Sequence, residues 1–292
     1  MKIERVISSN QEGFIQYCKQ YAAEHDDSYM PEEDFDPNTT HPSYILMDDE
    51  VIIGAVSLMV TPAFKEANKG RFMIFHSIRQ NLEGYQNLWD AIQPHTEGLE
   101  FTYLFVPESK RNIRDLWESL GFKIQRYSYV LSRGLEPLTP LDLPDGFHFV
   151  SLEEQDEEGL FSYSRIANRS FADMAGHVDT SLEDIKKMFH YSDSIEGGLM
   201  LLLDGEEPIG TLIVWDDEEV QGGSFLAGIS ILPEHRGRGF GRMTLRKGLH
   251  FSQERGYSKV SLSVNAENEN AVKLYLDEGF EKETVLICYE MR

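Results

Sequence analysis

The residues most suited to chemistry are the eight from His235 to Arg242, HRGRGFGR, which combine three alternating glycines with three arginines. Because glycine has no Cβ, an anion can come close to the backbone amides of such a loop. The apolar run that ends at Ile231 predicts a buried strand before the loop, and the apolar spacing of 242–255 predicts a helix after it. The first amides of a helix have no intrahelical partner and lie at the positive end of its dipole. This junction therefore predicts a site for a phosphate or pyrophosphate.

The glycine spacing alone leaves alternatives open. It reads G-x-G-x-G from Gly237 to Gly241, which is neither the G-x-G-x-x-G of dinucleotide-binding folds nor the Gly-Lys-Ser/Thr ending of a P-loop. A flexible turn with no ligand is a second interpretation of the loop. The residues that follow favour the ligand-binding interpretation.

The next segment, 259–280, predicts a strand and a second helix. Apolar and polar residues alternate over 260–265, as in a strand with one buried face. Asn268 is suited to cap the following helix, and Gly279 is suited to end it.

The loop and this segment together resemble the GNAT superfamily of acetyl-CoA-dependent N-acetyltransferases. The family signature Arg/Gln-x-x-Gly-x-Gly/Ala is met by RGRGFG, Arg236–Gly241. A second family pattern, Asn-x-x-Ala-x-x-Leu-Tyr-x-x-x-Gly-Phe, is met at Asn268, Ala271, Leu274, Tyr275, Gly279 and Phe280. The resemblance covers most of residues 147–292 and implies that acetyl-CoA is the co-substrate.

The resemblance also implies how acetyl-CoA is held. The loop amides would bind the pyrophosphate, and the pantetheine arm would lie along the strand that ends at Ile231, whose amide would polarise the acetyl carbonyl. Tyr275 would act as the general acid that protonates the leaving thiolate. The residues expected to bind the cofactor are Ile231, Arg236, Gly237, Arg238, Gly239, Phe240, Gly241, Arg242, Asn268 and Tyr275.

Three of these residues also have purely structural interpretations. Tyr275 can be a core aromatic residue on an amphipathic helix. Asn268 can be a helix cap, and Arg238 can be a solvated surface charge.

No general base is assigned, because the strand FLAGISIL contains no carboxylate. The acidic run at 216–219 is typical of a solvated hairpin. His235 lies on the phosphate side of the loop, and surface or packing roles are the better interpretation of His177 and His190.

The two halves of the chain share landmarks in the same order. Ile-Gly pairs at 53–54 and 209–210 are 156 residues apart, and the segments Leu116–Phe122 and Leu274–Phe280 match at a spacing of 158 residues. Two landmarks at nearly one spacing predict an internal duplication.

The predicted fold class is therefore α/β (α+β), with two tandem GNAT-like domains. Each domain is expected to be a mixed, mostly antiparallel twisted sheet flanked by helices. The expected ranges are 1–134 for the first domain, 135–146 for a proline- and glycine-rich linker, and 147–292 for the second.

The first half keeps the landmarks but not the chemistry. Trp117 stands where Tyr275 stands and has no acidic hydroxyl, and Lys110 replaces Asn268. The matching loop segment has one glycine, Gly84. We expect a degenerate domain that shapes the acceptor site, so that truncation before residue 140 leaves cofactor binding but impairs acceptor use.

Composition restricts the partners. A formal net charge of −23 repels nucleic-acid phosphate and favours a cationic acceptor, although solubility alone also explains such a charge. No run approaches the roughly 18 apolar residues of a membrane span. The start of the chain does not have the apolar core of a signal peptide, so a cytoplasmic location is expected. Cys18 and Cys288 have no metal or redox spacing; we expect buried thiols and no metal ion.

The leading hypothesis is an N-acetyltransferase in which a primary amine, of a small molecule or a peptide, attacks acetyl-CoA directly in a ternary complex. An alternative from another class is a non-catalytic acyl-CoA-binding regulatory module, which the missing base would explain. A third is a purely structural pseudoenzyme.

Overall fold

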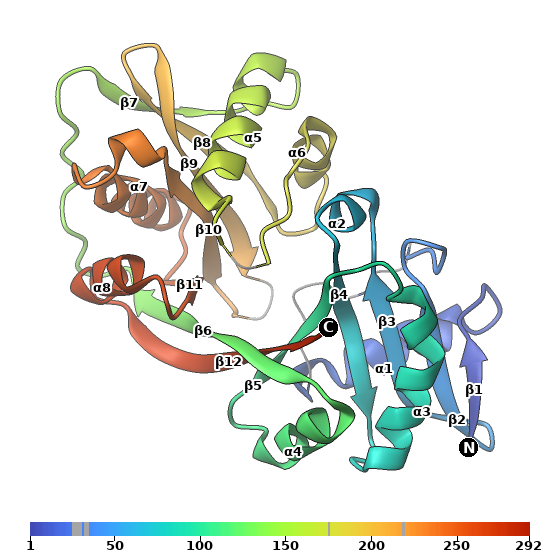
Figure 1. The fold of residues 1–292 in the computed structure, drawn as a ribbon. Coiled ribbons are helices and arrows are strands. Elements are labelled where there is room, and N and C mark those ends of the chain that lie inside the picture. The colour runs from blue at the N-terminus through green and yellow to red at the C-terminus, as the bar shows by residue number, and fades with distance from the viewer. Residues whose placement is uncertain (25–30, 32–34, 175, 218–219) are drawn as a thin grey trace. The chain divides into compact units, whose positions relative to one another are not determined.

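The computed structural model describes residues 1–24, 31, 35–174, 176–217 and 220–292, and these form two compact units (Figure 1). Unit 1 comprises Met1–Ser128, Asn265–Glu267 and Thr284–Arg292. Unit 2 comprises Tyr129–Val264 and Asn268–Glu283.

Unit 1 is built on a mixed sheet with helices on both faces. Its strands, in pairing order, are β1 (Lys2–Arg5), β2 (Ser43–Asp48), β3 (Val51–Met59), β4 (Lys69–Ser77), β5 (Phe101–Pro107), the end of β12 (Glu281–Met291) and the start of β6 (Lys123–Gly134). β4 and β5 are parallel, whereas β1 to β4 pair antiparallel in sequence order and β12 pairs antiparallel with β5. Its helices are α1 (Gln11–Gln20), η1 (Ala22–Glu24), α2 (Pro62–Glu66), α3 (Leu82–Ile92), η2 (Gln93–His95) and α4 (Arg111–Leu120).

The two faces of this sheet bury different clusters, because successive strand residues point to opposite sides. Phe75 of β4 packs among residues of α3 and α4, including Trp117. Its neighbour Ile74 packs on the other face against α1 residues such as Tyr17.

Unit 2 repeats this architecture. Its strands, in pairing order, are the end of β6, β11 (Lys259–Asn265), β10 (Gly223–Ile231), β9 (Glu207–Asp217), β8 (Ser194–Asp204) and β7 (Phe147–Ser151). β10 and β11 are parallel, whereas β7 to β10 pair antiparallel in sequence order. Its helices are α5 (Glu157–Phe171), α6 (Leu182–Met188), η3 (Pro233–His235), α7 (Phe240–Glu254) and α8 (Glu269–Asp277).

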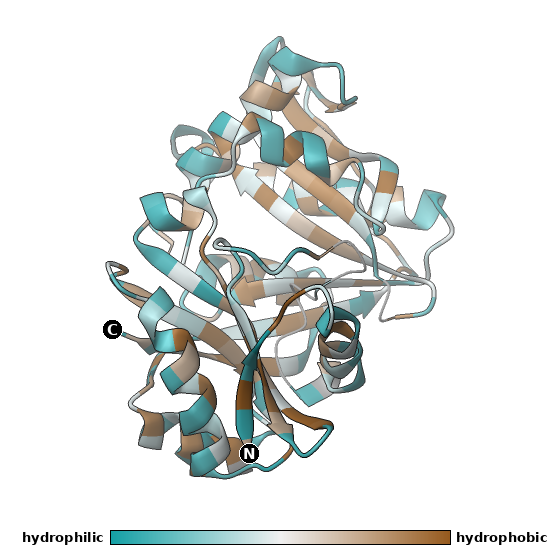
Figure 2. Cartoon of the chain, turned by 90° about the vertical axis from the view of Figure 1, so that its right-hand side faces the viewer, coloured by the Kyte–Doolittle hydropathy of each residue, from teal (hydrophilic) through white to brown (hydrophobic). Residues whose placement is uncertain are grey.

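Adjacent residues of β9 again separate two clusters in unit 2. Leu212 packs with Leu245 and Leu249 of α7, and Ile213 packs with Leu160 and Tyr163 of α5. In Figure 2 hydrophobic residues, in brown, are concentrated on the strands, whereas the helices carry both brown and teal.

The fold class is confirmed, and the two units are equivalent at the landmarks found in the sequence. Gly54 pairs with Ser77 in unit 1, and Gly210 pairs with Ile231 in unit 2. α4 and α8 each end before a glycine with positive φ, 99° at Gly121 and 86° at Gly279. These left-handed positions are suited to glycine, so they explain why the Gly-Phe pairs recur.

The strands that follow α4 and α8 each belong to both units. The end of β6 lies in unit 2, where Leu131 and Leu135 are almost fully buried in the core. The end of β12 lies in unit 1 and pairs with β5 from Leu286↔Pro107 to Met291↔Thr102. The compact units therefore do not coincide with the ranges 1–134 and 147–292, which stay a prediction about functional domains.

Cys18 and Cys288 are buried, and no disulfide joins them. Within the described ranges, no helix has the length and apolar character to cross a bilayer.

Candidate active site

The central feature of unit 2 is a point where two parallel strands part. β10 pairs with β11 from Gly223↔Lys259 to Leu226↔Leu262, and the pairing stops there although β10 continues to Ile231. The sheet therefore opens beside the last residues of β10, and an extended ligand can add to the exposed strand edge there.

A β-bulge lies where the strands part. The register between β10 and β9 shifts by one residue between Ala227 and Ser230. Gly228, inside the bulge, has a φ of 57°, and a Cβ built on it would lie 2.6 Å from the Tyr163 hydroxyl oxygen. Both the backbone conformation and the close approach require glycine at this position.

The backbone amide of Ile231 faces the open side of β10. Leu232 N donates to Ile209 O at 2.9 Å, so these two residues form a hydrogen-bonded pair of the antiparallel ladder. Because bonded and non-bonded pairs alternate, Ile231 and Gly210 form a non-bonded pair. The Ile231 N–H then points away from β9, toward the side where β11 has parted.

The glycine-rich loop joins this strand to α7. Gly237 and Gly239 have φ angles of 76° and 89°, and Gly239 is the residue before the first turn of the helix. A Cβ at either glycine would meet no atom within 4 Å, so the space above the loop is open. The predicted helix 242–255 is observed as Phe240–Glu254. Its first amides and the bare loop are suited to a pyrophosphate.

The loop arginines have structural partners that sequence reasoning did not anticipate. Arg236 donates through Nε to Ile231 O at 3.0 Å and through Nη2 to Ser170 O at 2.8 Å, so it braces the turn against α5. The Arg238 side chain is exposed, and its guanidinium lies 4.9 Å from the centre of the Phe240 ring.

Arg242 pairs with carboxylates of α8, as part of a network around Glu278. Glu278, 6% exposed, accepts from Arg246 at 2.9 and 2.8 Å and also from Arg242, which lies 3.4 Å from Asp277 as well. The hydrogen bonds and charges of Arg246 and Arg242 hold the pKa of Glu278 below its usual value. The network joins α7, which carries the loop, to α8, which carries Tyr275. The spacing of Arg242 and Arg246 on one helix face was the available sequence signal.

Tyr275 is 8% exposed and packs in the unit 2 core beside Phe280. Burial raises its pKa to about 12, so the phenol stays protonated at neutral pH. Asn268 caps α8 by accepting from Ala271 N at 3.2 Å, in agreement with the capping interpretation. Contact of either residue with a cofactor stays a prediction.

The histidines considered as bases have carboxylate neighbours in unit 2. His177 lies 3.0 Å from Asp179, and His190 lies 3.1 Å from Glu154. Asp216 and Asp217 end β9, whereas Glu218 and Glu219 lie outside the described residues. Within the described ranges no group of three or more His, Cys, Asp or Glu side chains is arranged to hold a metal ion.

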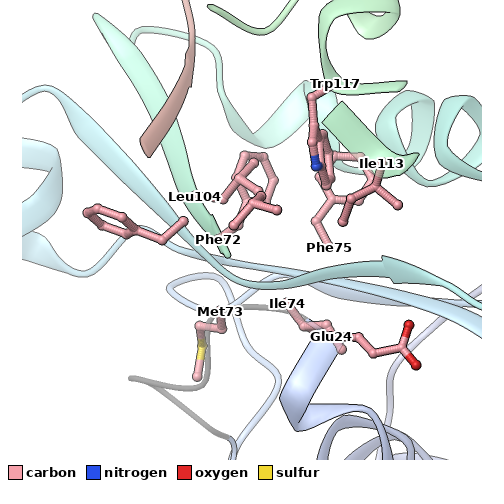
Figure 3. Close-up of a pocket in the computed structure, with 10 residues that line it drawn as sticks. Glu24, Phe72, Met73, Ile74, Phe75, Leu104, Ile113 and Trp117 are labelled. Carbon is pink, nitrogen blue, oxygen red and sulfur yellow. The ribbon is translucent and has the colours of Figure 1, made fainter. Parts of the chain in front are cut away.

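The equivalent point of unit 1 is filled by aromatic side chains. β4 and β5 pair in parallel from Lys69↔Phe101 to Arg71↔Tyr103 and then separate. Figure 3 shows Phe72, Phe75 and Trp117 at the gap, which retains a cavity of roughly 10 Å³. That volume is at the lower limit for one water molecule.

Comparison with known proteins agrees with this geometry. Residues 162–280 match the Acetyltransferase (GNAT) family. A mycothiol acetyltransferase of Kytococcus sedentarius is 32% identical over 158 residues, which are 52% of this chain and 51% of that protein. A mycothiol acetyltransferase of Thermomonospora curvata is 29% identical over 267 residues, 85% of this chain and 82% of that protein. The chain spans about half the length of the first two relatives it matches.

Solved structures with low sequence identity share the fold. A GCN5-related N-acetyltransferase of Sphaerobacter thermophilus has a TM-score of 0.71 at 15% identity, covering 99% of this chain and 95% of its own. A tandem GNAT protein from the clavulanic acid biosynthesis pathway also has a TM-score of 0.71, at 14% identity. The match covers 99% of this chain and 98% of that protein.

The fold and the site thus define an α/β protein whose sheet opens beside a glycine-rich helix N-terminus. Residues 162–280 form a domain of the Acetyltransferase (GNAT) family.

Proposed function

We propose that this protein is an N-acetyltransferase that transfers the acetyl group from acetyl-CoA to a primary amine of a small molecule or a peptide. The observation that carries the proposal is the outward-facing amide of Ile231 at the opening of the sheet, next to the glycine loop at the start of α7. The relatives named mycothiol acetyltransferase support a small-molecule acceptor.

The residues present fit acetyl-CoA. The open space above Gly237 and Gly239 leaves their backbone accessible to the pyrophosphate. The open edge of β10 is suited to the pantetheine arm, since both are extended and the edge presents hydrogen-bonding groups. Arg238 is placed to add positive charge near the loop, whereas Arg236 and Arg242 act on the protein's own backbone and carboxylates.

The amine attacks the acetyl carbon as the free base, the carbon–sulfur bond breaks, the attacking nitrogen loses one proton to water, and the thiolate takes up a proton. An alkyl amine with a pKa near 10.4 is neutral in roughly one molecule in 2,500 at pH 7, so its deprotonation limits the rate near neutrality. The Ile231 N–H stabilises the oxyanion that develops on the acetyl oxygen. Tyr275, protonated because its pKa is about 12, supplies the proton for the thiolate.

The alternative, a non-catalytic acyl-CoA-binding module, is favoured by the burial of Tyr275 in the core and by the absence of a carboxylate from β10. A cationic acceptor and the absence of a nucleic-acid partner remain parts of the proposal, supported by the net charge of −23. A cytoplasmic location and the absence of a membrane partner are carried over from the sequence as further parts of it.

Two measurements separate these functions. Calorimetric titration with acetyl-CoA should give binding, and a panel of primary amines should then release free thiol in step with acetylated amine. Binding with no transfer to any amine would support the regulatory module, and no binding at all would contradict both.

A further inference from the structure

Three buried hydroxyl groups surround the bulge of β10. Thr211 of β9 donates through Oγ1 to Gly228 O at 2.6 Å. Thr211 Oγ1 also lies 2.6 Å from Ser230 Oγ. Tyr163 of α5 lies over Gly228, with its hydroxyl oxygen 2.6 Å from the position that a Cβ on this glycine would take. Thr211 is fully buried, and Ser230 and Tyr163 are each 4% exposed.

Thr211 is the centre of this cluster. A threonine hydroxyl has one proton to donate and can accept two hydrogen bonds. Since its proton goes to Gly228 O, Ser230 must donate to it. The Thr211 side chain thus bonds to Gly228 and to Ser230, on either side of Ile229, and so fixes the bulge.

The bulge determines which way the Ile231 amide points. Before the bulge the register pairs Ala227 with Ile213, and continued without the insertion it would pair Ile231 with Ile209. Ile209 belongs to a hydrogen-bonded pair, so the Ile231 N–H would then be used within the ladder. The one-residue insertion turns it outward instead.

Unit 1 has a different arrangement at the matching positions. Ala55 pairs with His76 where Thr211 pairs with Ser230, and Ala55 has no hydroxyl. The register shift of that ladder lies elsewhere, between Ser57 and Leu58. The hydroxyl clamp, defined as Thr211 and its bonds to Gly228 and Ser230, therefore occurs in unit 2, which carries the glycine loop. The matching positions of unit 1 do not have it.

We propose that Thr211 is a positioning residue for acetyl transfer, because its hydroxyl holds the bulge in the register that aims the Ile231 amide at the acetyl carbonyl. This inference rests on the proposed function.

The test is Thr211→Val, which keeps the shape of the side chain and removes the hydroxyl. We expect kcat to fall about tenfold to a hundredfold, as misplaced transition-state donors do, while the Kd for acetyl-CoA measured by calorimetry changes by less than about threefold. Thr211→Ser should restore most of kcat. If the valine variant does not fold, Ser230→Ala removes one bond of the clamp and should lower kcat in the same direction.

Ser224→Ala is the matched control. It removes another buried hydroxyl pair of the same strand, Ser224 to Ser252 at 2.8 Å, in the part of β10 that is still paired with β11. Its kcat should equal that of the wild type. An equal loss in Ser224→Ala and Thr211→Val, or a serine variant as slow as the valine variant, would overturn the inference.

A readout without turnover separates this inference from the proposed function. In Thr211→Val the amide resonance of Ile231 should shift and its hydrogen exchange should change, because the amide changes its hydrogen-bonding side. An unchanged Ile231 amide would overturn the inference, whereas a wild-type protein that acetylates no amine would overturn the proposed function.

Discussion

At the scale of single residues, Tyr275 and the loop glycines make the most direct predictions. In the proposed mechanism Tyr275 combines a core position with a chemical role. The same burial that makes it part of the unit 2 core raises its pKa to about 12, so its phenol stays protonated at neutral pH.

We predict that Tyr275→Phe lowers kcat about a hundredfold, the lower range for loss of a general acid, with the acetyl-CoA Kd nearly unchanged. The kcat of the wild type should rise with pH as the amine loses its proton and should show no fall assigned to Tyr275 below about pH 12. A phenylalanine variant with wild-type kcat would remove Tyr275 from the mechanism.

The same tyrosine has an effect on stability. Its pKa is raised from 10.0 in the unfolded chain to about 12, so the folded state binds the proton more tightly between these values. Its contribution to the free energy of unfolding is complete below pH 10 and is lost as the pH rises toward 12.

Gly239→Ala tests the anion site. The φ of 89° is unfavourable for alanine by about 1–2 kcal/mol, and the added methyl group stands over the loop amides. We expect the acetyl-CoA Kd to rise at least about tenfold, the factor that corresponds to 1.4 kcal/mol.

Gly205→Ala is the control for that change. Gly205 has a φ of 60° and open space around it, in the turn between β8 and β9. It should lose similar stability in thermal melts and keep the wild-type Kd. Equal affinities in the two variants would mean that the loop does not hold the pyrophosphate.

At the scale of elements, α7 and α8 are locked together by the network around Glu278. Three arginines contact this residue, since Arg133 also donates to its backbone carbonyl. The lock fixes the position of the glycine loop relative to α8, which carries Tyr275. In the proposed function the loop and Tyr275 act on opposite ends of acetyl-CoA.

We predict that Glu278→Gln lowers the free energy of unfolding by about 1.5–3 kcal/mol at pH 7, the range for hydrogen bonds to charged groups. Because Arg246 and Arg242 hold the pKa of Glu278 below 4.5, the wild-type advantage is present above pH 4.5 and is lost as the pH falls below it. Urea unfolding at pH 7 and pH 4 measures the difference. If the difference in unfolding free energy between the wild type and Glu278→Gln is as large at pH 4 as at pH 7, the ion pairs of Glu278 are not its cause.

The elements themselves could largely be predicted from the sequence, because their signals are local. The β10–loop–α7 junction follows from an apolar run, glycines and helical spacing, and Asn268 and Gly279 mark the ends of α8. The isolated Gly228 within an apolar strand was the one available signal for the bulge.

Interactions between distant residues could not be predicted in the same way. Neither the bond from Thr211 to Gly228 nor the burial of Glu278 among arginines has a local pattern, since each depends on strand register or helix packing. The aromatic filling in unit 1 depends likewise on how Phe72, Phe75 and Trp117 meet in space. A single sequence gives no direct information about such pairings.

At the scale of the whole molecule, the shared strand β6 changes the expected result of truncation. Its end lies in the unit 2 sheet, where Leu131 is fully buried and Leu135, the residue after the strand, is 2% exposed. A fragment 147–292 lacks both side chains, each worth about 1.5–3 kcal/mol when buried, and leaves the edge of β11 unpaired.

We therefore predict that fragment 147–292 does not unfold cooperatively and does not bind acetyl-CoA, in contrast to the expectation from sequence that cofactor binding survives truncation. A fragment that begins at Tyr129 keeps β6 and should retain more helical circular dichroism. A 147–292 fragment with a sharp thermal transition and wild-type affinity would contradict this prediction.

The place of β12 has a consequence for biosynthesis. The first unit is completed by residues 284–292, so its sheet stays open along β5 while the ribosome translates the rest of the message. Most of unit 1 therefore leaves the exit tunnel before unit 2 but must wait for residues 284–292, and a premature stop before residue 284 would damage it.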